Sequence, residues 1–224
     1  MIKRILPSNV VSVDTFEDFP DGKLFPGEEA VVGQAVEKRR REFTTARTCA
    51  RKALRMLGKP PVAILPGVRG EPRWPTGVTG SITHCAGYRG AVLGESAQVA
   101  SIGIDAEPNE PLPNGVLDAI ALPVEREEVA RLALAHPEVH WDRLLFSAKE
   151  AVYKAWFPLT NRWLSFENAS VTVNPRDGSF SARLLVGGAN VYGEPLKGFS
   201  GRWLADQGLL LTAIVVPAPG ATPA

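Results

Sequence analysis

The chain has 224 residues, of which 45% are hydrophobic and 22% charged, and its 25 Lys and Arg exceed its 24 Asp and Glu by one. A chain of this length suits one large or two small domains and buries about 70% of its unfolded surface, so folding requires no disulfide or structural metal. A nearly neutral protein does not coat DNA or an anionic membrane with its whole surface.

Cysteine spacing and hydropathy indicate in which cellular compartment the protein is expected. Cys49 and Cys85 stand far apart without a CxxC pair, which excludes a thioredoxin or zinc motif and argues against a disulfide framework. The first residues reach Pro7 without an apolar stretch long enough for a signal peptide. The longest apolar run, 209–216, is far shorter than the ~18 residues of a membrane helix. We therefore expect a soluble, cytoplasmic protein with reduced thiols.

The first half of the chain predicts one long helix followed by three strands. Residues 37–57 contain no Gly or Pro, and Gly58 with Pro60 ends this helix. A loop rich in Pro and Gly continues to residue 75. Short apolar runs then predict strands at 81–85, 89–93 and 98–104.

The second half repeats this order of elements, although no residue-level repeat is visible. Residues 108–115 are rich in Pro and predict a linker. Two helices follow, 124–135 and 142–157, stopped by Pro137 and Pro158. Strands are predicted at 169–173, 180–186 and 209–216, with Asp177-Gly178 as a hairpin turn.

The repeated order predicts an α+β fold built from two similar halves. We place the boundary between residues 104 and 105, so that the halves are 1–104 and 105–224. A functional site is expected at their junction, because ligands commonly bind between such units.

The predicted helix 37–57 concentrates positive charge. Nine of the 25 basic residues lie between Lys38 and Lys59. At about 100° per residue, four arginines fall within about 80° of one another beside an apolar stripe: Arg40, Arg47, Arg51 and Arg55. Guanidinium groups bind phosphate oxygens bidentately, so the row favours a polyphosphate ligand. A solvated basic face or a nucleic-acid patch would show the same pattern.

A predicted strand in the middle of the chain ends with two carboxylates at alternate positions. Asp105 and Glu107 project to one side of this strand, while Ile102 and Ile104 point into the core. Adjacent carboxylates repel unless a cation lies between them, and all-oxygen ligands favour Mg²⁺. The alternative is an ordinary strand end with two solvated acids.

Glu150 and Lys154 are four residues apart on the predicted helix 142–157, on the side opposite its apolar stripe. This spacing is also that of an ordinary surface ion pair. Beside a magnesium-binding Asp105 and Glu107, however, Glu150 could supply a third ligand or a general base, and Lys154 a charge-neutralising acid.

Histidines offer one further candidate. Thr83 and His84 close a short strand, where a hydroxyl and an imidazole could reach a phosphate, although a lone histidine is more often structural. His136 and His140 have HxxxH spacing, but Pro137 breaks the helix between them. We interpret that pair as a coincidence.

The order of these motifs is more specific than any one of them. An Arg-rich helix, RGEP at 69–72 with GSITH at 80–84, GIDAEP at 103–108 and FSAKEAVYKAW at 146–156 together resemble the 4′-phosphopantetheinyl transferase superfamily. Within it, the match is to the monomeric surfactin- and enterobactin-type enzymes, and it covers residues 40–166. The resemblance implies two pseudo-symmetric α+β halves with the active site at their interface.

The resemblance also implies the reaction and its cofactors. Coenzyme A would donate its 4′-phosphopantetheine arm to a serine of an apo acyl or peptidyl carrier protein, releasing 3′,5′-ADP. Mg²⁺, or Mn²⁺ in its place, would bridge the coenzyme A diphosphate. The implied metal ligands are Asp105, Ala106, Glu107 and Glu150.

Residue roles follow from the matched motifs. Glu150 would take the serine proton, Lys154 would stabilise the departing nucleotide, and His84 would grip a phosphate at the catalytic centre. The residues implied to contact coenzyme A are Arg47, Arg51, Arg55, Arg69, Gly70, Glu71, Pro72, Thr83, His84, Asp105, Lys149, Glu150 and Lys154.

Two other functions stay open from sequence alone. A nucleic-acid-binding protein with a basic helix would leave Asp105, Glu107 and Glu150 unexplained. A relative that binds coenzyme A or carrier proteins without catalysis is the second. We expect a monomer whose partners are coenzyme A and carrier proteins, and neither nucleic acid nor a membrane.

Overall fold

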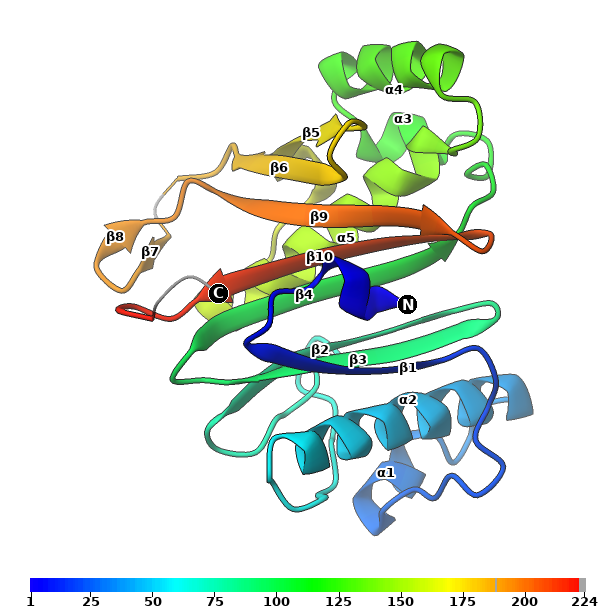
Figure 1. Ribbon diagram of the computed structural model, residues 1–224, viewed down its shortest axis with the longest axis vertical. Helices are drawn as coiled ribbons and strands as arrows, with labels where there is room; N and C mark the ends of the chain where they lie inside the picture. The colour runs from blue at the N-terminus through cyan, green and yellow to red at the C-terminus, as the bar shows by residue number, and fades with distance from the viewer. Residues whose placement is uncertain (188, 222–224) are drawn as a thin grey trace.

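The computed structural model describes residues 1–187 and 189–221, in which two larger antiparallel sheets lie side by side, each packed against a long helix, and a third sheet has two short strands (Figure 1). One sheet has the strand order β1-β3-β2 and packs on α2, and the other has the order β4-β10-β9-β6-β5 and packs on α5. The elements in chain order are η1 (Ile2–Ile5), β1 (Val10–Thr15), α1 (Pro26–Val31), α2 (Glu37–Met56), β2 (Val78–Cys85), β3 (Tyr88–Glu95), β4 (Val99–Pro108), α3 (Val116–Ile120), α4 (Pro123–Ala135), α5 (Trp141–Thr160), η2 (Phe166–Asn168), β5 (Ala169–Asn174), β6 (Ser179–Leu184), β7 (Asn190–Val191), β8 (Glu194–Pro195), β9 (Gly198–Asp206) and β10 (Leu209–Pro217).

The mixture of helices and antiparallel sheets confirms the predicted α+β class. Within residues 1–187 and 189–221, no helix is both long and apolar enough to cross a membrane.

The long helix α2 ends where the sequence predicts. Gly58 adopts a left-handed φ of +69°, which glycine reaches without a Cβ clash. The Lys59 amide then donates to the Leu54 carbonyl at 2.9 Å, so a Schellman-type turn satisfies the end of the helix.

The helix α5 runs three residues beyond its predicted end. Pro158 was expected to stop it, yet α5 continues to Thr160 with Pro158 in its last turn. A proline so close to the C-terminus removes a single amide donor. The actual stop is Asn161, whose φ of 51° is left-handed and whose amide donates to the Phe157 carbonyl at 2.8 Å.

Several elements were not predicted, among them β1, α1 and β9. The β9 strand lies in the middle of the five-stranded sheet although Gly198 and Gly201 lower its strand propensity. Gln207 and Gly208 have positive φ, 49° and 74°, in a two-residue turn that joins β9 to β10, and the glycine at 208 was the available sequence signal for this hairpin. Two such residues form the primed turns that favour tight hairpins.

The two sheets meet where β2 runs beside β4. Ser81 Oγ accepts a hydrogen bond from the Ile104 amide at 3.2 Å, and Thr83 Oγ1 accepts one from the Ala106 amide at 3.0 Å. Side-chain hydroxyls thus join backbones that do not pair as a ladder. The boundary predicted after residue 104 falls within β4, which pairs with β10 along its length.

Alternation along β4 sorts its side chains as predicted. Ile102 and Ile104 are fully buried in a core shared with η1 and β10. The other face of β4 meets α5 so closely that a Cβ on Gly103 would overlap the Ala151 carbonyl oxygen. Asp105 lies on this same face and therefore points toward α5.

Candidate active site

A cavity of about 570 Å³ is lined by residues from both predicted halves of the chain. Its walls come from α2, the loop before β2, β2 itself and α5. Nine of the predicted site residues line it: Arg47, Arg69, Gly70, Glu71, Pro72, Thr83, His84, Glu150 and Lys154. The fold thus brings together motifs that are separated by up to about 100 residues of sequence.

Asp105 lies beside this cavity and is 5% exposed. Lys154 Nζ donates to its Oδ1 at 2.7 Å and to the Ile104 carbonyl at 3.1 Å, and Thr83 Oγ1 lies 3.4 Å from the same Oδ1. The second carboxylate oxygen, Oδ2, is buried and has no hydrogen-bond partner among residues 1–187 and 189–221. A buried oxygen of this kind is a natural ligand for a cation.

Glu107 lies on the α5 face of β4 with Asp105. Its Oε2 accepts a hydrogen bond from Arg143 Nη1 at 3.0 Å, and Arg143 also bonds the Pro111 carbonyl at 2.8 Å. Burial raises the pKa of Glu107, and the nearby Asp105 charge raises it further against the opposing effect of Arg143. The two carboxylates therefore repel each other, as the sequence pattern predicts.

Glu150 projects into the cavity from α5. Burial raises the pKa of Glu150, Lys154 opposes this rise, and Asp105 adds to it. A carboxyl whose pKa is raised toward neutrality is better suited to accept a proton than an ordinary solvated one. The alternative of an ordinary Glu150–Lys154 surface ion pair is not what the structure shows, because the Lys154 ammonium bonds Asp105.

The carboxylate oxygens of this region are of the chemical type that divalent cations such as Mg²⁺ prefer. Asp105 offers a buried oxygen, and Glu107 and Glu150 are carboxylates whose pKa values respond to it. No group of three or more His, Cys, Asp and Glu side chains in the described parts of the chain converges closely enough to hold a metal. Two of the three carboxylates already bond a cationic side chain, Asp105 through Lys154 and Glu107 through Arg143.

His84 is held by charged groups of α2. Arg39 Nη1 lies 2.6 Å from Nε2 of the imidazole, and Glu42 Oε2 lies 3.9 Å from Nδ1. Because Arg39 can only donate, Nε2 is the acceptor and Nδ1 carries the proton of the neutral ring. Burial lowers the pKa of His84, and the Arg39 charge lowers it further.

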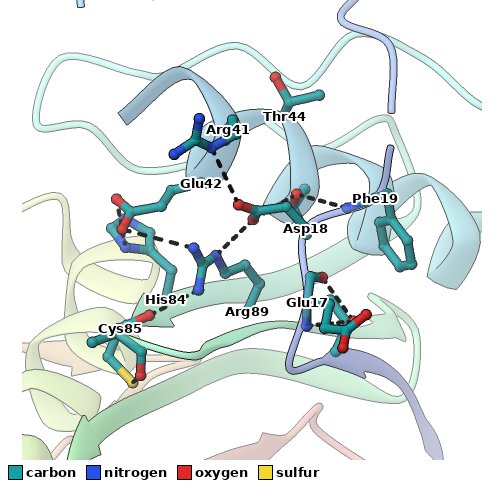
Figure 2. A network of polar contacts seen from close by, with 12 residues as sticks. Glu17, Asp18, Phe19, Arg41, Glu42, Thr44, His84, Cys85 and Arg89 are labelled. Carbon is teal, nitrogen blue, oxygen red and sulfur yellow. Dashed lines mark hydrogen bonds and ion pairs between the residues drawn. The ribbon is translucent and has the colours of Figure 1, made fainter. Parts of the chain in front are cut away.

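Figure 2 shows the network of polar contacts behind this histidine. Arg89 lies between Glu42, 3.8 Å from its Nη2, and Asp18, 3.2 Å from its Nε, and it donates to the Cys85 carbonyl at 3.0 Å (Figure 2). Arg89 is 7% exposed. This buried guanidinium ties β3 to α2 and to the end of β2, where His84 lies.

Arg47 reaches the cavity from the buried side of α2. Its guanidinium stacks 3.9 Å from the centre of the Phe43 ring, and its Nε donates to the Ile64 carbonyl at 3.1 Å. Burial lowers its pKa to about 10, so the group stays charged at neutral pH. Across the cavity, Arg69 lies 5.6 Å from the ring centre of Trp163.

Comparison with known proteins assigns the chain to a family. Residues 27–94 match the 4′-phosphopantetheinyl transferase N-terminal domain, and residues 101–197 match the 4′-phosphopantetheinyl transferase superfamily. The 4′-phosphopantetheinyl transferase Svp of Streptomyces mobaraensis is 56% identical over 99% of this chain and 92% of its own. The chain belongs to the 4′-phosphopantetheinyl transferase superfamily.

Other relatives agree with this assignment. The 4′-phosphopantetheinyl transferase PptT of Mycobacterium tuberculosis is 50% identical over 96% of this chain and 98% of its own. Enterobactin synthase component D of Escherichia coli K12 is 35% identical over 56% of this chain and 59% of its own. The family that the motifs resemble is therefore confirmed.

Three of the coenzyme A contacts expected from the superfamily lie elsewhere. Arg51 is buried in an ion pair with Glu28 at 2.8 Å, and Arg55 is exposed on a separate pocket of about 370 Å³. Lys149 is buried in an ion pair with Glu125 at 2.8 Å. Charge spacing on a helix cannot tell a ligand-binding cation from one that an internal carboxylate already holds.

One residue that sequence reasoning missed is Arg39, which lines the cavity beside His84. Arg39, Phe43 and Arg47 are spaced four residues apart on α2, so they follow one face of the helix. Phe43 supplies the apolar surface between the two guanidinium groups. This i, i+4, i+8 spacing was the available signal.

Proposed function

We propose that the protein transfers the 4′-phosphopantetheine arm of coenzyme A to a serine of apo acyl or peptidyl carrier proteins, releasing 3′,5′-ADP. The observation that carries the proposal is the single cavity lined by Arg47, Arg69, His84, Glu150 and Lys154. It joins cations suited to phosphates with a carboxylate suited to proton transfer in a chain of this superfamily.

Coenzyme A binding falls to the basic wall of the cavity. Its three phosphates carry about four negative charges, and the guanidinium groups of Arg39, Arg47 and Arg69 line the cavity together with His84. The planar guanidinium groups favour bidentate phosphate contact. Burial of Arg47 strengthens each such contact, because the local dielectric is low.

Mg²⁺ would be held by Asp105, Glu107 and Glu150, with the Ala106 carbonyl near them, and Mn²⁺ would suit the same oxygen ligands. When bound, such an ion neutralises charge on the diphosphate during transfer. The buried, unpartnered Oδ2 of Asp105 supports this assignment.

The transfer itself is a displacement at the β-phosphorus. The carrier serine oxygen bonds this phosphorus, and the bond from phosphorus to the bridging oxygen breaks, so that 3′,5′-ADP leaves. Glu150 takes the serine proton, which its raised pKa favours. Lys154, fixed by Asp105 and the Ile104 carbonyl, stabilises the negative charge that the leaving group gains.

The partners follow from this chemistry. A monomer of the surfactin or enterobactin type would bind coenzyme A between its halves and receive the carrier protein at the mouth of the cavity. The basic helix would attract carriers, which are generally acidic. Fatty-acid, polyketide and nonribosomal peptide carriers are the classes to test.

Mass spectrometry tests the proposal directly. We would incubate the protein with apo carrier proteins of all three classes, coenzyme A and Mg²⁺. A mass gain equal to one phosphopantetheine on the carrier serine is expected. No gain on any carrier, with a known transferase active on the same preparations, overturns the proposal.

A matched pair of variants then tests the base. Glu150→Gln keeps the size of the side chain but cannot accept the proton, so transfer should fall by about two to four orders of magnitude. Glu127→Gln makes the same change on an exposed helical position and should leave transfer unchanged. If Glu150→Gln turns over near the rate of the unmodified protein, Glu150 is neither base nor essential ligand.

A further inference from the structure

Glu28 is a buried carboxylate that lies outside the cavity and yet is bonded on every side. It is fully buried at the start of α1. Its Oε2 accepts the Phe25 amide at 2.8 Å, its Oε1 accepts the Ile64 amide at 2.8 Å, and Arg51 Nη1 lies 2.8 Å from both oxygens. Arg51 also stacks 4.7 Å from the centre of the Phe25 ring.

The backbone of Ile64 connects Glu28 to Arg47, which lines the cavity. Its amide is bound by Glu28, and the carbonyl of the same residue accepts Arg47 Nε at 3.1 Å. A guanidinium group is planar, so a hydrogen bond that anchors its Nε also restricts the directions in which both Nη groups can donate. The position of Ile64 therefore sets the direction in which Arg47 presents its remaining donors.

Ile64 also begins the loop that supplies another part of the cavity wall. The Arg73 amide donates to the Leu65 carbonyl at 2.8 Å, and the Gly67 amide donates to the Glu71 carbonyl at 2.6 Å. These bonds close a hairpin in which residues 69–72, from the turn and the returning leg, line the cavity. Glu28 thus holds the base of a loop that lines the cavity.

We infer that Glu28 is a positioning residue for coenzyme A binding. It acts through the backbone of Ile64 on Arg47 and on the 69–72 loop. The inference rests on the proposed function, since it concerns the same cavity. Glu28 touches neither substrate nor the reacting atoms, so its loss should weaken ligand binding more than it slows the chemical step.

The first experiment measures coenzyme A affinity by calorimetry, without metal or carrier protein. Glu28→Gln should raise the dissociation constant roughly tenfold, within the range seen for directly connected residues. In transfer assays the KM for coenzyme A should rise by a similar factor while kcat changes less than threefold. Glu28→Asp keeps the charge beside Arg51 but is too short to hold the Ile64 amide, so it should weaken binding in the same direction in a more stable protein.

A double-mutant cycle shows whether the effect passes through Arg47. In an Arg47→Ala background, Glu28→Asp should raise the dissociation constant by a clearly smaller factor than it does with Arg47 present, because only the route through the 69–72 loop remains. Leu132→Ala, a fully buried truncation in α4, controls for general loss of stability and should leave coenzyme A affinity unchanged.

The outcomes separate this inference from the proposed function. If the unmodified protein transfers phosphopantetheine and both Glu28 variants bind coenzyme A as it does, the positioning role is overturned alone. The same holds if the Glu28→Asp effect persists undiminished without Arg47, or if Leu132→Ala weakens binding equally. An unmodified protein that neither binds coenzyme A nor transfers its arm overturns both.

Discussion

The two halves of the molecule are built around matching buried ion pairs. In the first, Glu28 of α1 binds Arg51 of α2, and in the second, Glu125 of α4 binds Lys149 of α5, each at 2.8 Å. Each carboxylate also accepts the amide of its N-cap residue and the amide of a later segment, Ile64 or Val171. The chain repeats at this level although its sequence shows no repeat.

The difference between the pairs lies in what they hold. The first pair is linked to Arg47 through the Ile64 backbone, and Arg47 lies in the wall proposed to bind phosphates. The second lies next to Glu150, and its lysine also donates to the Phe166 and Ala169 carbonyls, which fixes α5 against the start of β5. The first ion pair thus adjoins the wall proposed to bind coenzyme A, and the second adjoins Glu150, the proposed base.

The largest effect should come from removing one cation. Lys149→Met leaves the Glu125 carboxylate buried without its counter-charge, which should cost about 3–5 kcal/mol of unfolding free energy. Urea unfolding measures this cost. Transfer kinetics should show a lower kcat, because α5 carries Glu150, whereas Arg51→Met should mainly raise the KM for coenzyme A.

A compensating change checks the cause. With Glu125→Gln added to Lys149→Met, neither charge remains, and part of the lost stability should return. If the double variant is no more stable than Lys149→Met, the charge pair is not what holds α5. If both single variants affect kcat and KM alike, the division of labour between the halves is wrong.

The contact between β4 and α5 gives the next largest effect. Gly103→Ala would drive a Cβ into the Ala151 carbonyl and to 2.8 Å from the Ala155 amide, both rigid helix backbone. Overpacking of this kind should cost about 3 kcal/mol, and displacement of α5 should slow transfer because Lys154 bonds the Ile104 carbonyl.

The first sheet supplies the matched control for this substitution. The three atoms nearest to a Cβ on Gly90 of β3 would be side-chain atoms of Tyr88, at 3.2 to 3.5 Å. Gly90→Ala should therefore destabilise the protein much less and leave transfer rates close to normal. Thermal and urea unfolding of the two variants, run in parallel, provide the comparison. Equal losses would mean that the close approach of α5 to β4 is not special.

Local rules predicted part of this architecture well. The helix α2, the alternation along β4 and the hairpin turn at Gly178, with its φ of +70°, depend on neighbouring residues and follow from the sequence. The fate of a buried cation does not. Arg47 and Arg51 are one turn apart on α2, yet one faces the cavity and the other Glu28, because α1 lies 20 residues upstream and packs against only one of them.

The smallest expected effect concerns titration, because burial shifts the pKa values of His84 and Glu150 in opposite directions. The pKa of His84 in the first half is lowered from 6.5, and that of Glu150 in the second is raised from 4.5. The proposed mechanism requires the Glu150 carboxylate, so kcat/KM should fall as the pH drops through the raised pKa of this group. Glu150→Gln should gain stability relative to the unmodified protein above that pKa, because the proton favours the folded state.

Two substitutions test which group causes the fall in kcat/KM at acid pH. The pKa values are measured by NMR titration of labelled Glu and His side chains without metal. Asp105→Asn removes a charge that raises the pKa of Glu150 and should lower it, while Glu42→Gln removes a charge that raises the pKa of His84 and should lower that instead. If Glu42→Gln moves the Glu150 titration by as much as Asp105→Asn does, the two halves do not titrate independently. Separate responses would show that each half sets the protonation of its own functional group by burial and by its own carboxylates.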